Sequence, residues 1–557
     1  MKKSVFFALV SMLLLNLAIA SHGKALNQND LPKIEQQLRL LIAKAGVKQL
    51  LAEDIASEMK REVSPKRIEF GHTALDIFSD TDVCVTIDFR YEEQNGVLSL
   101  LFRWQRPFPR LLDRSYWLVN TEVSDDIHED TTWTSDGSPY YVTRSIHIHG
   151  GVTLNIEQGT VVRFRKFNDP REHINLSVSD GGGTLLSQGT DANPVTFTTS
   201  CDFEDFDEIQ SMGKESSDWQ AIRTKLNGNI IVRHTILEYA NWSVETWERE
   251  GQIIVSDSKF RKCRGGVYTD GWSSVTVTNN TISDCWEKAI YVDFQGVPDA
   301  GGDIVSNTIT TRPDTHPSEV MVINGGIPNI SGNVITGSFE NGIHTSWGAG
   351  TISGNEVTGS FYTGIRLDDF HGVVTSNMIN SPSDRSWACI AAWGGECTIS
   401  DNYIEGYFDI GIYLEDVRGS GRVSGNTIIG PVDEILPVAI QITGGEPTVE
   451  FNEISADTFD QVIRVEEEST ATIMNHCSLT GNYGVYCVNS APHINFNDIV
   501  GNVEFGVYNE TPDDHTVYAE ENWWGDPSGP SGEGGGTGDA VSSGVVFEPW
   551  RDEPVCE

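Results

Sequence analysis

The chain has 557 residues, a length that one compact core rarely supports unless the structure grows by repetition. Its 80 acidic residues outnumber the 38 basic ones, and the formal net charge is −42 at pH 7. This acidity argues against nucleic acid or anionic lipid as a partner, and it favours solubility in a salty exterior or cation binding.

Residues 1–20 have the pattern of a secretory signal peptide. Two lysines precede an apolar run from Val5 to Ala20, and the run ends in small residues that suit cleavage. The run is shorter than a typical membrane span, and no later segment is long and apolar enough for one. We therefore expect a secreted protein (extracellular, cell-surface or periplasmic) that has no membrane span and is a monomer.

Residues 21–115 predict a small α+β N-terminal domain, or a helix that covers one end of the following repeats. Apolar residues recur at helical spacing within 27–62, and residues 66–106 alternate as strands do, notably at 84–89 and 97–102. The Pro-rich segment 106–114 is expected to be a linker.

An asparagine that precedes an apolar residue by two positions recurs through the second half of the chain. The series is Asn280, Asn307, Asn333, Asn355, Asn377, Asn402, Asn426, Asn452, Asn475, Asn497 and Asn522. A second series, often Gly-Ile or Gly-Val, keeps register with it from Val267 to Val507. Two registered series with steps of 22 to 27 residues indicate a repeat architecture.

The repeats read as short strands and turns, because Val, Ile and Thr alternate in stretches broken by Gly, Asn and Ser. A coil of three strands and three turns, about 22 residues long, brings the chain back one strand spacing of about 4.8 Å higher. The predicted fold is therefore an all-β, right-handed parallel β-helix over residues 116–530, followed by a cap segment at 531–557. The asparagines are expected to bond to one another in a buried column.

Several segments resemble the pectin-lyase-like superfamily of right-handed parallel β-helices. They are TWTSDGSPYYVTRSIHIHGGVTLNIEQGTVVRF (Thr132–Phe164), GTLLSQGTDANPVTFTTS (Gly183–Ser200), NWWGDPSGP (Asn522–Pro530) and GDAVSSGVVFEPW (Gly538–Trp550). The resemblance covers about residues 117–550 and implies that the C-terminal motif closes the open end of the core. It says little about activity, because members include lyases, hydrolases, adhesins and binding proteins.

If the chain is exported, its nine cysteines enter an oxidising compartment, and some of them should form disulfides. Cys263 and Cys285 take equivalent places on neighbouring coils, and the coil spacing predicts a disulfide between them. Cys389 and Cys397 flank one turn and could also pair. Cys477 and Cys487 occupy apolar positions, where core thiols are as reasonable as a bond.

Strand alternation places two rows of side chains on one outer face of the predicted solenoid. One row includes Tyr268, Tyr291, His344, Arg366 and Tyr413. The other includes Asp270, Asp293, Asp368, Trp393 and Glu415. Aromatic rings stack on the apolar faces of sugars, and carboxylates bond to sugar hydroxyls. The rows therefore suggest contact with an extended glycan, although an ordinary solvated sheet face would have the same pattern.

A sharper cluster lies within these rows. Arg366, Asp368, Asp369 and His344 are the candidate catalytic residues, and Trp347 is a further candidate for substrate contact. Arginine with carboxylates could serve a polysaccharide lyase, and paired carboxylates a glycoside hydrolase. The polygalacturonase pattern is not met, because Asp368-Asp369 and His371-Gly372 share one loop, so no role is carried over from that family.

Metal binding has weak signals in the sequence. The acidic loop Cys201–Ile209 could hold Ca²⁺, but it lacks the EF-hand pattern. His147 and His149 share a strand face without an evident third ligand. With only seven methionines, this does not favour copper delivery of the kind known from NosD-type β-helices. We expect no cofactor, with Ca²⁺ as the exception to test.

The leading hypothesis is a non-catalytic, secreted β-helix protein that binds an extracellular polysaccharide or a cell-surface glycan, or displays an interaction surface. The alternatives are a polysaccharide lyase or glycoside hydrolase that acts around Arg366, and a structural or adhesive module.

Overall fold

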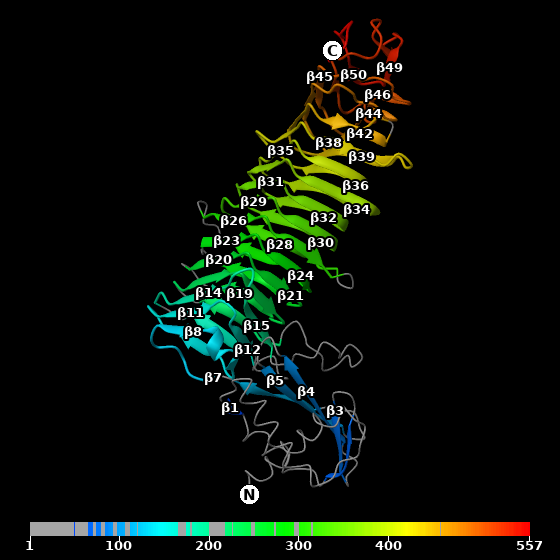
Figure 1. Ribbon diagram of the computed structural model, residues 1–557. Coiled ribbons are helices and arrows are strands. Elements are labelled where there is room, and N and C mark those ends of the chain that lie inside the picture. Colours follow the sequence, from blue (N-terminus) through cyan, green and yellow to red (C-terminus); the bar gives the residue numbers. More distant parts are fainter. Residues whose placement is uncertain are drawn as a thin grey trace. The chain divides into compact units, whose positions relative to one another are not determined.

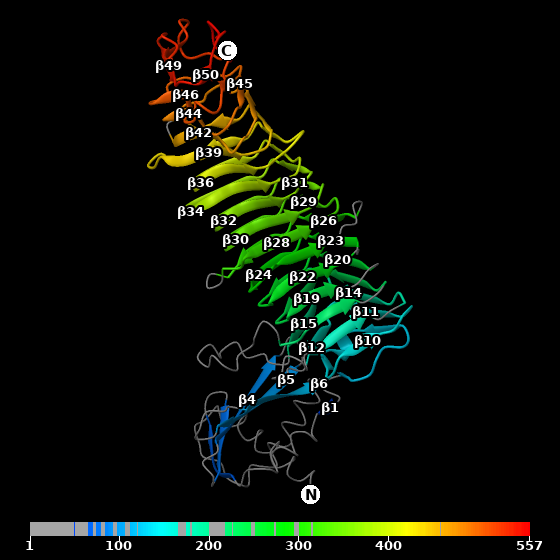
Figure 2. The ribbon, with the colours of Figure 1, turned by 180° about the vertical axis from the view of Figure 1, so that it is seen from behind.

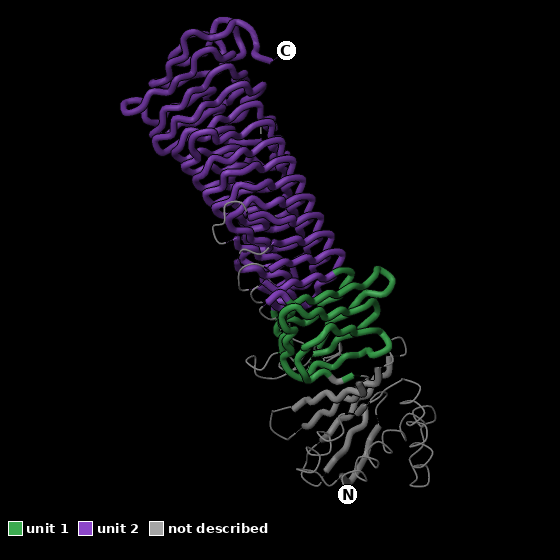
Figure 3. The backbone as a smooth tube through the Cα atoms, turned by 90° about the vertical axis from the view of Figure 1, so that its left-hand side faces the viewer, with its two compact units in different colours: residues 1–179, 183–222, 233–241 green, residues 180–182, 223–232, 242–557 purple. Residues whose placement is uncertain are grey.

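The computed structural model describes the backbone of six strands within 49–119. It also describes residues 121–164, 174–178, 181–199, 218–224, 227–246, 251–271, 274–294, 300–312, 316–456 and 458–556. The chain divides into two compact units (Figure 3). Unit 1 comprises residues 1–179, 183–222 and 233–241, and unit 2 comprises residues 180–182, 223–232 and 242–557.

Three predictions fall on other parts of the chain. The signal peptide at 1–20 and the acidic loop Cys201–Ile209 lie outside the described residues. So do the helices expected within 27–62, where only the short strand β1 (Gln49–Leu50) is described.

Unit 1 begins with a six-stranded antiparallel sheet, in the order β1-β6-β5-β4-β3-β2. Its strands are β1 (Gln49–Leu50), β2 (Pro65–Phe70), β3 (Ala74–Ser79), β4 (Cys84–Glu92), β5 (Val97–Gln105) and β6 (Leu112–Val119). β4 and β5 contain the two strands that alternation predicted. β6 runs through the predicted boundary at residue 115, because residues 112–117 pair with β5 and so belong to this sheet.

The described residues of unit 1 after β6 form parallel coils. Its strands are β7 (Thr121–Val123), β8 (Thr131–Trp133), β9 (Tyr140–Val142), β10 (Ile146–Ile148), β11 (Thr153–Glu157), β12 (Val161–Phe164), β13 (Asn175–Val178), β14 (Thr184–Gln188), β15 (Val195–Thr199) and β18 (Thr235–Glu238), with a 3-10 turn at Ser135–Gly137. β8, β11 and β14 pair in parallel, as do β9, β12, β15 and β18. β16 (Ala221–Thr224) and β17 (Asn229–Arg233) cross the division between the units.

Unit 2 is a right-handed parallel solenoid in which each coil returns one strand higher (Figures 1 and 3). One face consists of β20 (Gln252–Ser256), β23 (Ser274–Thr278), β26 (Gly302–Val305), β29 (Asn329–Ser331), β31 (Thr351–Ser353), β33 (Val373–Thr375), β35 (Thr398–Ser400), β37 (Arg422–Ser424), β40 (Thr448–Glu450), β43 (Thr472–Met474), β45 (His493–Asn495), β47 (Val517–Tyr518) and β50 (Val545–Val546). Figure 2 shows several of these strands stacked from behind.

A second sheet of unit 2 supplies the other two positions of each coil. Its strands are β19 (Trp242–Thr246), β21 (Lys259–Arg261), β22 (Gly265–Asp270), β24 (Thr281–Cys285), β25 (Ile290–Asp293), β27 (Thr308–Thr311), β28 (Glu319–Asn324), β30 (Val334–Ser346), β32 (Glu356–Asp368), β34 (Met378–Trp393), β36 (Tyr403–Glu415), β38 (Thr427–Ile429), β39 (Leu436–Thr443), β41 (Glu453–Ile454), β42 (Phe459–Glu466), β44 (Tyr483–Val488), β46 (Phe505–Asn509), β48 (Pro530–Gly532) and β49 (Gly538–Val541). The predicted parallel β-helix is thereby confirmed. Its parallel pairing continues past residue 530, to β50.

The predicted column of asparagines is present. From Asn280 to Asn452, the side-chain Nδ2 of each member donates to the Oδ1 of the next at 2.9–3.0 Å, and each Nδ2 also donates to a main-chain carbonyl. All members are buried. The column therefore satisfies polar groups that the turn takes out of water.

One member of the column was assigned wrongly. His476, and not Asn475, stands between Asn452 and Asn497: its Nε2 lies 3.3 Å from Asn452 Nδ2 and its Nδ1 lies 3.0 Å from Asn497 Oδ1. Asn475 takes the preceding left-handed turn position, with φ +60°. The spacing rule chose the asparagine because it expected the same residue type in every coil.

The apolar series predicted from the sequence forms the core. Ile343, Ile365, Ile390, Ile412 and Ile440 have no exposed surface and stack directly above one another in register. Phenylalanines stack in the same core, for example Phe339 on Phe361 with ring centroids 5.7 Å apart. The apolar surface buried by this repetition is the main source of stability for such a solenoid.

The disulfide in the structure joins Cys477 to Cys556, with Cα atoms 5.4 Å apart. The predicted bond between Cys263 and Cys285 is absent, and both residues are buried thiols. Each Sγ instead lies against the main-chain carbonyl two residues before it, at 3.5 and 3.8 Å. The prediction used only the spacing of the coils, whereas the direction of each side chain decides whether a bond forms.

The chain ends against the last coils of unit 2. The backbone N–H groups of Val555 and Cys556 donate to the carboxylate of Asp498, at 2.6 and 3.3 Å. Trp524, from the predicted closing motif, is fully buried, and Trp550 Nε1 donates to the carbonyl of Pro527 at 3.2 Å.

Candidate functional site

The strand register of unit 2 aligns the two predicted outer rows. The first runs Tyr268, Tyr291, Val322, His344, Arg366, Ala391, Tyr413, Gln441, Arg464, Tyr486 and Tyr508. The second runs Asp270, Asp293, Asn324, Ser346, Asp368, Trp393, Glu415, Thr443, Glu466 and Val488. Val322 and Ala391 are buried, so the first row is not exposed throughout.

Four of the predicted binding residues form one end of these rows. Tyr268 and Tyr291 stack with ring centroids 4.6 Å apart and an interplanar angle of 9°. Asp270 and Asp293 are register partners beside them, and Tyr291 Oη donates to Asp293 Oδ2 at 3.4 Å. This end of the face therefore has aromatic surface next to two carboxylates.

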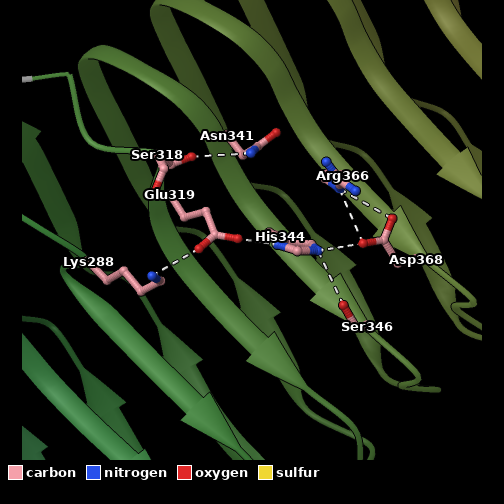
Figure 4. Close-up of polar contacts among 8 residues, drawn as sticks. All are labelled: Lys288, Ser318, Glu319, Asn341, His344, Ser346, Arg366 and Asp368. Carbon is pink, nitrogen blue, oxygen red and sulfur yellow. Dashed lines mark hydrogen bonds and ion pairs between the residues drawn. The ribbon is translucent and has the colours of Figure 1, made fainter.

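Further along the rows, charged residues from four coils form a continuous chain of contacts (Figure 4). Lys288 Nζ lies 3.0 Å from Glu319 Oε2. His344 Nδ1 lies 2.5 Å from Glu319 Oε1, and His344 Nε2 lies 2.8 Å from Asp368 Oδ2. Arg366 Nε donates to both oxygens of Asp368 at 3.2 Å. We call these five residues the charge chain.

The contacts within the charge chain favour the charged forms of Glu319, His344 and Asp368. Hydrogen bonding to His344 outweighs burial and lowers the pKa of Glu319 to about 2, with Lys288 adding to the effect. Burial alone would raise the pKa of Asp368 and lower that of His344. Their mutual hydrogen bond, the hydrogen bond of His344 to Glu319 and the opposite charges, Arg366 included, together reverse both effects. The pKa of Asp368 therefore lies below its usual value and the pKa of His344 above it.

Aromatic side chains from β32, β34 and β36 adjoin the charge chain. Tyr362 stacks on Trp387 at 5.2 Å, Trp387 stacks on Trp393 at 5.6 Å, and Tyr413 tilts against both tryptophans at 5.0 and 5.7 Å. The four residues form what we call the aromatic cluster. Trp387, Trp393 and Tyr413 of this cluster pack against a small group of buried apolar residues that includes Ala391. Tyr362, at the edge of the aromatic cluster, is 54% exposed.

Arg366 links the two groups. Its guanidinium carbon lies 4.7 Å from the centre of the Trp393 ring, a cation–π contact. Its Nε is bound to Asp368, and its two Nη nitrogens have no hydrogen-bond partner among the described residues. Those donors are available at a position beside exposed aromatic surface. Tyr413 Oη in turn donates to Glu415 at 2.7 Å.

Two predicted site residues lie away from the charge chain. Asp369 and Trp347 occupy the turn that follows the strand, both in the left-handed region with φ +50° and +55°. Asp369 faces His371, with Oδ1 and Nε2 3.6 Å apart. Trp347 is 71% exposed. The structure therefore brings together His344, Arg366 and Asp368 and leaves Asp369 out, because the chain turns directly after Asp368.

Sequence reasoning missed Lys288, Glu319, Tyr362 and Trp387 as members of this site. Glu319 aligns with Asn341, in a third column that the two rows did not include. Trp387 follows a register shift between Ser381 and Ser386, so no periodic pattern could place it. Tyr362 lies in the register shift between Thr358 and Thr363, for the same reason.

The Ca²⁺ prediction at Cys201–Ile209 lies outside the described residues. No group of three or more His, Cys, Asp or Glu side chains in the described part of the chain is arranged to hold a metal ion. His149 stacks on the ring of His128 with centroids 4.1 Å apart. The main chain of His147 donates to Asp126 Oδ1 at 3.0 Å. Among the described residues, no helix is long and apolar enough to cross a membrane.

Two family models match parts of the chain. Residues 318–499 match the family described as right handed beta helix region, and residues 207–382 match the family described as periplasmic copper-binding protein (NosD). No curated protein is significantly similar to the chain. Both matches agree with the parallel coils and the asparagine column, and the chain is a right-handed parallel β-helix repeat protein.

Proposed function

We propose that this protein is exported and binds an extended glycan, without cleaving it, along the outer face that holds the charge chain and the aromatic cluster. The NosD match supports a location outside the cytoplasm, because that family is described as periplasmic. The resemblance to the pectin-lyase-like superfamily, which contains carbohydrate-active proteins, supports a glycan as the partner.

The observation that carries the proposal is the position of Arg366 between carboxylate and aromatic surface. Tyr362 in the aromatic cluster offers an exposed ring, against which the apolar face of a sugar can pack. The Nη donors of Arg366 and the carboxylate of Glu415 can bond to sugar hydroxyls. A few placed polar groups beside aromatic side chains are typical of sites for organic ligands.

The same geometry argues against catalysis. A glycoside hydrolase needs one carboxylic acid that is protonated near neutral pH, and a lyase needs an available base. Asp368 and Glu319 have lowered pKa values, and His344, with a raised pKa, is hydrogen-bonded to both. The groups therefore satisfy one another, which suits a rigid binding surface better than proton transfer.

The test is native affinity electrophoresis of the full chain in gels that contain glucomannan, xylan, laminarin or polygalacturonate. We expect at least one polymer to retard the protein, and Tyr362→Ala to reduce the retardation. Tyr403→Ala is the matched control, because Tyr403 is 39% exposed and lies on β36 outside the aromatic cluster. Absence of retardation in every gel would overturn the proposal.

The enzymatic alternative is tested on the same polymers by assaying reducing ends and unsaturated ends. We expect neither product to accumulate. Turnover by the natural protein that is lost in both Arg366→Ala and Asp368→Ala would show that the site is catalytic.

A further inference from the structure

A second group of aromatic residues lies further along the same face. Tyr483 and Tyr486 on β44 contact Phe505 and Tyr508 on β46. Their ring centroids are 6.3 Å apart for Tyr483–Phe505, 5.7 Å for Tyr483–Tyr508, 5.1 Å for Tyr486–Tyr508 and 5.0 Å for Phe505–Tyr508. All four side chains are half-buried, so each keeps some exposed surface. We call them the distal cluster.

The distal cluster repeats the arrangement around Arg366. Arg464 Nε donates to Glu466 Oε2 at 2.8 Å, as Arg366 Nε does to Asp368, and in both cases the carboxylate is two residues further along the strand. The Arg464 guanidinium carbon lies 5.5 Å from the centre of the Tyr486 ring, on the next coil. The Arg366 guanidinium carbon likewise lies 4.7 Å from the centre of an aromatic ring on the next coil, that of Trp393, which is the register partner of Asp368 rather than of Arg366.

The two arrangements are in register along one row. From Arg366 the row passes through Ala391, Tyr413 and Gln441 to Arg464. That is four strand steps, or about 19 Å at the usual strand spacing.

After the buried Ala391, the two side chains of the row between the arrangements, Tyr413 and Gln441, are polar and half-buried. Gln441 Nε2 donates to Glu466 Oε1 at 2.7 Å, and Tyr413 Oη donates to Glu415. The face therefore continues from one aromatic group to the other without an apolar interruption on this row after Ala391.

We infer that the distal cluster is a second binding subsite, in addition to the one formed by the charge chain and the aromatic cluster. One extended glycan chain spans both subsites. This inference rests on the proposed function and specifies its ligand as a polymer rather than a short oligosaccharide. Once one subsite is occupied, binding at the other becomes intramolecular, which raises the overall affinity without any new contact. Affinity should therefore depend on chain length.

The test compares Tyr486→Ala and Tyr508→Ala with the natural chain in the gels that contain glucomannan, xylan or laminarin. For a polymer that retards the natural protein, we expect each variant to bind roughly tenfold or more weakly. Tyr362→Ala combined with Tyr486→Ala should abolish retardation. Tyr518→Ala is the matched control, because Tyr518 is 37% exposed and stacks on His493 in the other sheet.

Disaccharides of the same glycan, which are too short to span the row, provide the second measurement. Calorimetry should show that Tyr486→Ala does not change the affinity with which the charge chain and the aromatic cluster bind these disaccharides. If the natural chain is retarded and Tyr362→Ala weakens binding, but neither distal variant does, the second subsite is overturned and the proposed function stands. If no polymer retards the natural chain, both are overturned.

Discussion

His476 is the residue that departs most from the repeat. It stands in the asparagine column, where its two ring nitrogens contact Asn452 and Asn497 in place of an amide. The side chain is fully buried, and burial lowers its pKa from 6.5 to about 4, against the opposing hydrogen bond to Asn497. The column therefore contains one member that is neutral only while the pH stays above that value.

His476→Asn should make the solenoid less sensitive to acid. The unfolded chain binds this proton near pH 6.5 and the folded chain only near pH 4, so stability present above pH 6.5 is lost as the pH falls toward 4. The loss is at most about 3 kcal/mol. Chemical unfolding at several pH values between 6.5 and 4 measures the free energy of unfolding of both proteins. As the pH falls, this free energy should decrease less for His476→Asn than for the natural chain. If it decreases equally for both, His476 is not the group responsible.

Asn355→Ala should destabilise the folded protein by roughly 1–3 kcal/mol, the usual penalty for leaving buried polar groups without partners. Asn355 accepts from Asn333 and donates to Asn377, so its removal affects both neighbours. Asn329→Ala is the control, because Asn329 is exposed and its amide donates to Asp303 at the surface rather than to a column neighbour. The measurement is the midpoint of denaturant unfolding. Equal midpoints for the two variants would show that the column is not stabilising.

At the scale of elements, the four long strands β30, β32, β34 and β36 bring the candidate site together. Each has 13 to 16 residues and joins two faces of a coil without a break. The strands bend at a column of small residues, where Gly337 pairs with Gly359 in register. A Cβ on Gly359 would lie 1.9 Å from the carbonyl oxygen of Gly337. The bend therefore depends on the absence of side chains.

Gly359→Ala should cost about 3 kcal/mol or more, because it combines a backbone clash with φ +150°, which side chains rarely adopt. Gly354→Ala is the matched control. Gly354 has φ +62° and no atom within 4 Å of the added Cβ, so only about 1 kcal/mol of backbone strain is expected. Thermal unfolding measures the loss of stability of each variant. A similar loss for Gly359→Ala and Gly354→Ala would mean that the backbone at Gly359 can shift to accommodate the added Cβ.

For the whole molecule, charge restricts the class of glycan. The net charge is −42, and carboxylates such as Asp270, Asp293, Glu415 and Glu466 lie along the candidate face. Arg366 and Arg464 are each already bound to a carboxylate. The electrostatic balance therefore opposes a polyuronate and permits a neutral polymer.

We expect neutral polymers to retard the protein more strongly than polygalacturonate at low ionic strength. Salt screens the repulsion between the acidic protein and the polyuronate. Added sodium chloride should therefore reduce the difference in retardation between neutral polymers and polygalacturonate. The affinity gels, run at low and high salt, make the comparison. Stronger retardation by polygalacturonate at low salt would show that Arg366 and Arg464 outweigh the acidic background.

The candidate site was partly predictable from the sequence. Alternation along strands placed His344, Arg366 and Asp368 on one face, because residues in register on stacked coils must share a column. The candidate catalytic residues also included Asp369, which lies in the turn after that strand. Two residues of the site could not be predicted: Glu319, which binds His344, and Trp387, which completes the aromatic cluster. They depend on a column and a register shift that no regular spacing reveals.

The sequence by itself determined the solenoid, its coil length and its buried columns, because a periodic pattern of Asn, Ile and Val leaves few other ways to bury these residues together. Only the tertiary structure decided which side chains contact one another. It paired Cys477 with Cys556, 79 residues away, and left Cys263 and Cys285 as thiols. It also placed His476 in the column. The physical reason is that spacing sets the height of a residue in the stack, whereas side-chain direction and turn geometry set its partners.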